Sequence, residues 1–276
     1  MKVSVVSMID ALEELLEDAS TLLTSLGPDP VPGSVAAMER LEWREGDEPE
    51  TAHSLGLFLL ETAGDHAFAL ARALRPPEYL AIAPWTCARA VLESAAYGTW
   101  VMDPSATLRE RVGRSFACVY VSHEQFRRAA VAANDADGVH TITGMIDSLE
   151  GRAVQSGYPR LSDRRGRRLG VGVRYPRATD CIREQLDMEY EYRIFSGVAH
   201  GLPSSVMQVC FRPVDGAQPA VQKHLQPEYA AFLLRQSTRA VVGVMNARLT
   251  LYGHNVEDFA PAVARAYSRM LPQPPS

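Results

Sequence analysis

Residues 85–102 read WTCARAVLESAAYGTWVM. The stretch is apolar on almost every side, rich in small side chains, and interrupted by only two charges, Arg89 and Glu93. A helix that is hydrophobic all round is buried among neighbours, whereas a surface helix keeps a polar face. The stretch therefore predicts a central helix that other helices enclose.

Helical periodicity also governs the chain on both sides of this stretch. Apolar residues three and four apart predict a first helix that ends at Gly27 and a longer one that begins near Pro49. Further helices are predicted over residues 34–43, 103–133, 139–156, 179–200, 227–252 and 255–267. Asp103 and Pro104 are interpreted as the N-cap and first helical residue of one of them. The alternation in Ser205–Phe211 predicts one short strand.

Together these elements predict an all-α fold, a single helical bundle of seven or more helices with one basic loop and at most one short strand. The length of 276 residues favours one large domain over two equal ones, because no linker divides the chain. We expect residues 1–48 to form an N-terminal helical appendage of this domain and residues 158–178 to form the basic loop.

Composition limits the classes of function. With 46% hydrophobic and 22% charged residues, the chain is typical of globular proteins and is neither disordered nor of low complexity. Lys and Arg number 28 against 33 Asp and Glu, so the net charge of −5 argues against nucleic-acid binding by bulk charge. Any such binding must be local.

Basic side chains concentrate in one segment. Residues 160–177 hold seven arginines interleaved with glycines. A mobile loop of this composition can wrap a phosphate backbone or an acidic partner. We expect its anion-binding side chains to be Arg164, Arg165, Arg167 and Arg168. A solvated loop that offsets the charge of the acidic first helix is an equally good interpretation.

The cysteines and the N-terminus predict the cellular location. Cys87, Cys118, Cys181 and Cys210 form no CxxC pair and are interpreted as reduced thiols. Acidic residues follow the short apolar run at the N-terminus at once, which argues against a signal peptide. No stretch is apolar enough to span a bilayer. We therefore expect a cytoplasmic protein without membrane contact, and no residue cluster predicts a metal or a cofactor.

The sharpest functional pattern lies near residue 200, where Arg193 and His200 are seven residues apart. Seven steps of 100° come to about 700°, roughly 20° short of two turns, so both side chains share one helix face about 10.5 Å apart along the axis. Arg193 offers a planar, permanently charged group for a phosphate. His200 lies in the last turn, where the helix dipole favours the protonated imidazole.

This spacing resembles the R-x4-6-H signature of the HEPN superfamily, all-helical bundles that often dimerise, many of them metal-independent ribonucleases of toxin and defence systems. The matched segment runs from Arg193 to His200. The resemblance implies that Arg193 holds the scissile phosphate while His200 assists attack by the RNA 2′-hydroxyl and departure of the 5′-oxygen. The product would be a 2′,3′-cyclic phosphate. The residue after the arginine is usually polar in the superfamily, and here it is Ile194.

A second resemblance covers two separate segments. Residues 89–104 and 192–201 look like parts of a family of uncharacterised bacterial all-helical proteins. This likeness implies that the two segments belong to one bundle and face each other. Arg89 and Glu93 would then support the site, with Glu189 four residues before Arg193.

Structural roles compete with these interpretations. Glu189 has the favoured spacing for a helical ion pair with Arg193. Arg89, Glu93 and Arg193 would form a paired network if they are buried, because buried charges need partners. A second histidine, His66, lies on an apolar stripe with no other histidine at ligand spacing, which favours a core histidine over a metal ligand.

Three function classes follow. The leading hypothesis is a HEPN-like, homodimeric protein that cleaves or binds RNA in a stress or defence role, with Arg193 and His200 as catalytic residues. The alternative is a non-enzymatic helical module that binds a protein partner or a small ligand in a groove between helices. The third is a tailoring enzyme that acts on a small metabolite and uses His66 or His200 in an apolar pocket. A large enclosed cavity lined by Trp85, Tyr97 and Trp100 would support this third class.

Overall fold

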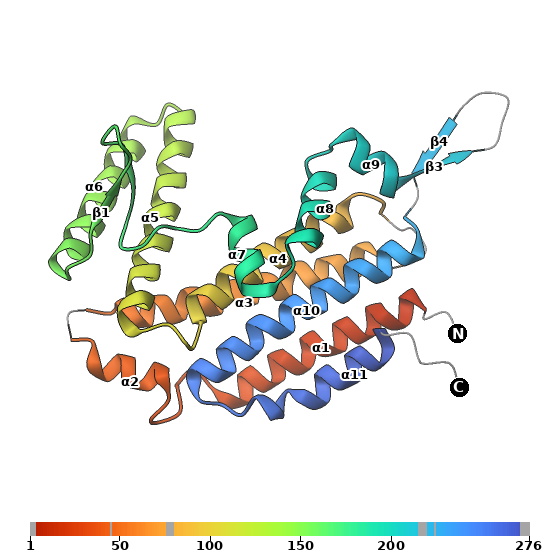
Figure 1. Ribbon diagram of the computed structural model, residues 1–276, viewed down its shortest axis with the longest axis horizontal. Coiled ribbons are helices and arrows are strands. Elements are labelled where there is room, and N and C mark those ends of the chain that lie inside the picture. The colour runs from red at the N-terminus through yellow and green to blue at the C-terminus, as the bar shows by residue number, and fades with distance from the viewer. Residues whose placement is uncertain (1–3, 45, 76–79, 215–219, 224, 271–276) are drawn as a thin grey trace.

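The computed structural model describes residues 4–44, 46–75, 80–214, 220–223 and 225–270 (Figure 1). The α-helices in these ranges are α1 (Val5–Leu26), α2 (Val35–Glu42), α3 (Glu48–Ala73), α4 (Ala83–Met102), α5 (Leu108–Ala132), α6 (Ala136–Gln155), α7 (Ala178–Leu186), α8 (Glu189–Ala199), α9 (Pro203–Cys210), α10 (Pro227–Tyr252) and α11 (Ala260–Met270). A 3-10 turn, Val256–Asp258, precedes α11. The all-α class and the bundle of more than seven helices are confirmed.

Helix α4 lies at the centre of the bundle, as predicted. It packs against α3, α7, α8 and α10 (Figure 1). The side chain of Trp85 is completely buried. A Cβ atom on Gly98 would lie 2.8 Å from Val244 of α10 and 3.3 Å from Leu59 of α3. The absence of a side chain at Gly98 therefore permits the close approach of the three helices.

Helix α1 is part of the main core. It packs against α3, α10 and α11 (Figure 1), and its residues Met8, Ile9 and Leu12 have no exposed surface. Its apolar stripe needs a partner surface on the bundle. Residues 1–48, expected as an appendage, therefore contribute directly to the core through this helix.

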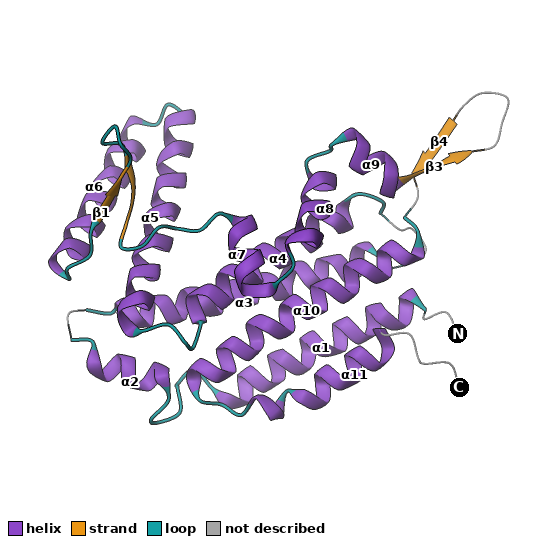
Figure 2. Ribbon diagram, viewed as in Figure 1, coloured by secondary structure: helices purple, strands orange, loops and turns teal. Residues whose placement is uncertain are grey.

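A second, smaller core lies between α5, α6 and the segment expected to be a mobile basic loop. That segment is instead an antiparallel hairpin of β1 (Arg160–Ser162) and β2 (Arg168–Val171) laid beside both helices (Figure 2). Tyr158 and Val171 are buried there with Phe116. The Asp163 carboxylate accepts hydrogen bonds from two backbone N–H groups of the turn, which explains why the arginine-rich segment is ordered.

The start of α5 differs from the prediction. Asp103 and Pro104 precede the helix, which begins after Thr107. The Thr107 hydroxyl accepts from the backbone N–H of Glu110, and the Glu110 carboxylate accepts from the backbone N–H of Thr107. This reciprocal capping box satisfies two backbone donors at once. Asp103 instead caps its own turn by accepting from Ser105.

The helix predicted over residues 179–200 is broken into α7 and α8. The break falls at Asp187, whose backbone is left-handed with φ of 53°. Asp tolerates this conformation better than most residues because its short polar side chain can bond locally. The break separates Arg193 and His200 from α7 but leaves both on α8 and its C-cap.

The strand predicted at Ser205–Phe211 is mostly wrong. Helix α9 occupies residues up to Cys210 because Pro203 opens a helical turn. Phe211 begins β3 (Phe211–Val214), which pairs with β4 (Ala220–Lys223). Where at most one short strand was expected, the described residues hold two short hairpins, and the class stays all-α. Among the described helices, none combines the length and apolarity of a membrane span.

Candidate functional site

The packing of α4 against α8 brings the two halves of the predicted site together. Phe195 and Val198 bury the inner face of α8, so Arg193 and His200 face outward. Ile194, which replaces the polar residue of the superfamily pattern, packs against the main core. Partial burial of Ile194 is thus a structural reason for an apolar residue at this position.

Arg193 is an exposed cation held by its own helix. Nε and Nη2 of Arg193 donate to the carboxylate oxygen Oε1 of Glu189 at 2.8 Å and 2.6 Å. The side chain of Arg193 is 66% exposed. The ion pair predicted four residues apart is therefore confirmed. The hydrogen bond from Arg193 lowers the pKa of Glu189. A surface pair of this kind adds little stability, so Arg193 can exchange Glu189 for another anion at small cost.

His200 forms the C-cap of α8 and is bonded to α4. Nη1 of Arg89 lies 2.9 Å from Nε2 of His200. Because a guanidinium can only donate, Nε2 must accept with its lone pair. The contact with Arg89 places a cation beside the imidazole at the end of α8.

Glu93 and Tyr192 hold Arg89 in place. Nε of Arg89 donates to Oε1 of Glu93 at 2.9 Å, and the Tyr192 hydroxyl donates to the same oxygen at 2.7 Å. Partial burial lowers the pKa of Arg89, but the Glu93 charge outweighs it and raises that pKa. The predicted network of Arg89 and Glu93 exists, but it reaches His200 and leaves out Arg193, which lies with Glu189 instead.

The four arginines predicted to bind anions lie elsewhere. They are on the β1–β2 hairpin over α5 and α6, separate from α8 (Figure 1). Arg167 pairs with Asp163, and Arg168 pairs with Asp147 and Glu150. Arg164 and Arg165 lie exposed in the turn. The structure therefore does not join this basic segment to the Arg193 and His200 pair.

The aromatic residues expected to line a cavity are packed against other rings. Trp85 meets Phe195 at 5.8 Å between ring centroids, and Tyr97 stacks on Tyr175 at 4.8 Å. Trp100 meets Tyr175 edge-on. Each of the three rings is therefore packed against another aromatic side chain, and the small-metabolite hypothesis stays a prediction.

The histidine enclosed in the core is His53 rather than His66, which is half-buried. His53 is 1% exposed, and its Nε2 lies 2.9 Å from the Glu39 carboxylate. Arg111, with no exposed surface, donates to the same carboxylate from Nε at 2.9 Å. This buried cluster of Glu39, His53 and Arg111 is inaccessible to a substrate and joins α2, α3 and α5.

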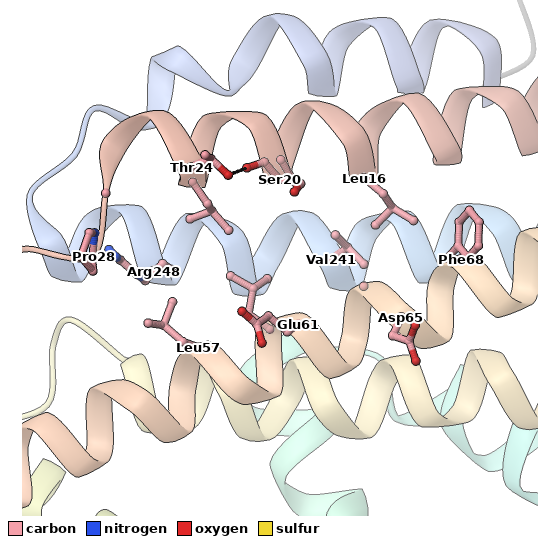
Figure 3. A pocket seen from close by; sticks show the side chains of 15 residues that line it. Leu16, Ser20, Thr24, Pro28, Leu57, Glu61, Asp65, Phe68, Val241 and Arg248 are labelled. Carbon is pink, nitrogen blue, oxygen red and sulfur yellow. Dashed lines mark hydrogen bonds between the residues drawn. The ribbon is translucent and has the colours of Figure 1, made fainter.

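A groove between α1, α3 and α10 has no counterpart among the residues that the sequence singles out (Figure 3). Its volume is about 650 Å³. Most of its lining is apolar, and Arg248 of α10 lies at one end beside Pro28 (Figure 3). The only signal in the sequence was Arg248, one of three arginines in α10, which lies among apolar residues near the end of the helix. Its position in the sequence does not reveal that its side chain is buried.

Comparison with known proteins finds no match to any family model, curated protein or solved structure. The resemblance to the HEPN superfamily therefore rests on Arg193, His200 and their spacing.

Proposed function

We propose that the protein is a HEPN-like, homodimeric RNA-cleaving protein of a stress or defence system, with its active site on the exposed face of α8. The observation that supports this proposal best is the exposure of Arg193 and His200 on one helix, with Arg89 bonded to the imidazole. Arg193 would bind the scissile phosphate in place of Glu189.

The chemistry requires a proton acceptor and a proton donor. The 2′-hydroxyl oxygen attacks phosphorus while its proton passes to a base, and the P–O5′ bond breaks as the 5′-oxygen gains a proton. Nε2 of His200 would take the proton of the 2′-hydroxyl once Arg89 turns from the imidazole to the phosphate, and the resulting imidazolium would pass a proton to the departing 5′-oxygen. No metal takes part in this scheme. The products are a 2′,3′-cyclic phosphate and a free 5′-hydroxyl.

The test is incubation of the purified protein with mixed single-stranded RNA in EDTA, followed by analysis of fragment ends. We expect cyclic phosphate ends, and we expect His200→Ala to slow cleavage by about 100-fold or more. His140→Ala serves as the matched control, because His140 is exposed on a distant helix.

Arg193→Ala is paired with Arg128→Ala. Arg128 has a similar exposure of 65% and a carboxylate partner, Glu124, four residues before it. Loss of cleavage in Arg193→Ala but not in Arg128→Ala would support a phosphate-binding role. Absence of cleavage by the folded wild type, or equal cleavage by wild type and His200→Ala, would contradict the proposal.

A further inference from the structure

Arg248 is a buried cation without a counter-ion. The residue is 1% exposed. Its Nε and Nη1 are enclosed and make no hydrogen bond to any described residue, and it forms no ion pair within the described part of the chain. Its guanidinium stacks on the Tyr252 ring with 3.0 Å from Cζ to the ring centroid. Burial, together with the positive charge of Arg40, lowers the pKa of Arg248 to about 10, so it remains charged at neutral pH.

An uncompensated buried charge is costly, and most buried charges are paired with a carboxylate or phosphate. Arg111 in the same protein shows the ordinary arrangement, since Glu39 and backbone carbonyls accept from all its nitrogens. Arg248 differs because Nε and Nη1 have no partner among the described residues, while its side chain lines the end of the groove beside Pro28 (Figure 3). The missing partner is therefore an anion that enters from outside.

Most of the remaining lining of the groove is apolar. Leu16, Leu23, Leu57, Leu60 and Val241 line it. From Leu16 to Thr24 it follows α1 for roughly 12 Å. Figure 3 shows Arg248 and Pro28 at one end and Phe68 and Asp65 at the other.

Besides Arg248, the polar side chains that line the groove are Ser20, Thr24, Glu61 and Asp65. The Thr24 hydroxyl already donates to the Ser20 carbonyl. Glu61 and Asp65 are exposed to water. A peptide would bring backbone N–H and C=O groups that find few partners on this lining, at a free-energy cost for each. An alkyl chain has no such groups.

We infer that the groove between α1, α3 and α10 binds a fatty acid, with its carboxylate on Arg248 and its alkyl chain along Leu57, Leu60 and Val241. The ligand supplies the charge that Arg248 lacks and covers the apolar lining. The size of the groove lies within the range of small-molecule sites. The site is separate from Arg193 and His200, and the inference does not depend on the proposed function.

The test is calorimetric titration of the full chain with dodecanoate and with dodecanol, which share an alkyl chain and differ in the head group. We expect wild type to bind dodecanoate about tenfold or more tightly than dodecanol. A charged hydrogen bond between the carboxylate and Arg248 would account for a difference of this size. Arg248→Met should bind both ligands within about twofold of each other. This variant is expected to fold, since replacing a buried charge by a hydrophobic residue is often neutral or stabilising.

A second variant tests the groove itself. Gly64 lines it on α3, and a Cβ there would meet only Leu16, at 3.9 Å. Gly64→Leu should therefore fill the groove without strain and abolish binding of both ligands, while Arg193→Ala should bind dodecanoate as wild type does. Equal binding of both ligands by wild type, a preference retained in Arg248→Met, or binding retained in Gly64→Leu would overturn the inference.

Discussion

The buried carboxylate of Glu39 holds two other buried groups, Arg111 and His53. Burial raises the pKa of Glu39, but hydrogen bonds from His53 and Arg111 outweigh that effect and lower it. Because the pKa of Glu39 is lower in the folded state, the carboxylate contributes its full stabilisation at pH values above its pKa in the unfolded chain, which is about 4.3. This contribution is lost as the pH falls through the folded pKa.

Replacement of Glu39 by glutamine has two expected effects. Glu39→Gln leaves Arg111 charged and unpaired, so we expect the free energy of unfolding at pH 7 to fall by about 3–5 kcal/mol. Urea denaturation measures this value. Repeated between about pH 5 and pH 3, it should show a smaller decrease with acid in Glu39→Gln than in wild type. An unchanged acid slope would mean that other carboxylates control acid unfolding.

At the residue scale, sequence predicts local pairs and misses distant ones. The contact of Glu189 with Arg193 follows from helical spacing alone. The contact of Arg89 with His200 depends on how α4 and α8 cross. The burial of Arg111 and Arg248 depends on at least three helices each, so no spacing rule identifies either as a buried charge.

At the scale of the helix, the capping box formed by Thr107 and Glu110 stabilises the start of α5. Thr107→Ala removes the acceptor for the Glu110 backbone N–H, and we expect a loss of about 1 kcal/mol in the free energy of unfolding. Thr141→Ala, at an exposed position inside α6, is the control and should change stability by less than about 0.5 kcal/mol. Equal effects of the two variants would show that the capping box is not what stabilises the helix start.

Sequence predicts the presence of helices better than their ends. The apolar stripes of α1, α3, α4 and α10 lead to the correct elements. Asp103 and Thr107 are both good N-cap residues, and only Thr107 has an acidic residue, Glu110, at the position that completes a capping box. The left-handed Asp187 and the turn at Asp163 depend on backbone conformation, which side-chain periodicity does not reveal.

Two hydrophobic cores divide the molecule. The main core includes α1, α3, α4 and α10, and the smaller one lies between α5, α6 and the β1–β2 hairpin. Because the two cores form separate apolar clusters, we expect a destabilising substitution in one core to increase local unfolding in that core alone. Leu149→Ala, in α6, should cost about 2–5 kcal/mol and lower amide-exchange protection in α5, α6 and the hairpin.

The matched variant lies in the other core. Leu233 of α10 is completely buried, so Leu233→Ala should lower protection in α1, α3, α4 and α10. Hydrogen exchange followed by mass spectrometry separates these regions. A uniform loss of protection across all helices in Leu149→Ala would mean that the two cores unfold as one cooperative unit.

The central place of α4 also has a consequence during synthesis on the ribosome. Helix α4 ends at residue 102, and its partner α10 starts at residue 227. At typical elongation rates, translation of the intervening chain takes on the order of ten seconds. For that interval the nascent chain has α3 to cover α4 but not α10, so one face of this central apolar helix stays exposed until the residues of α10 emerge.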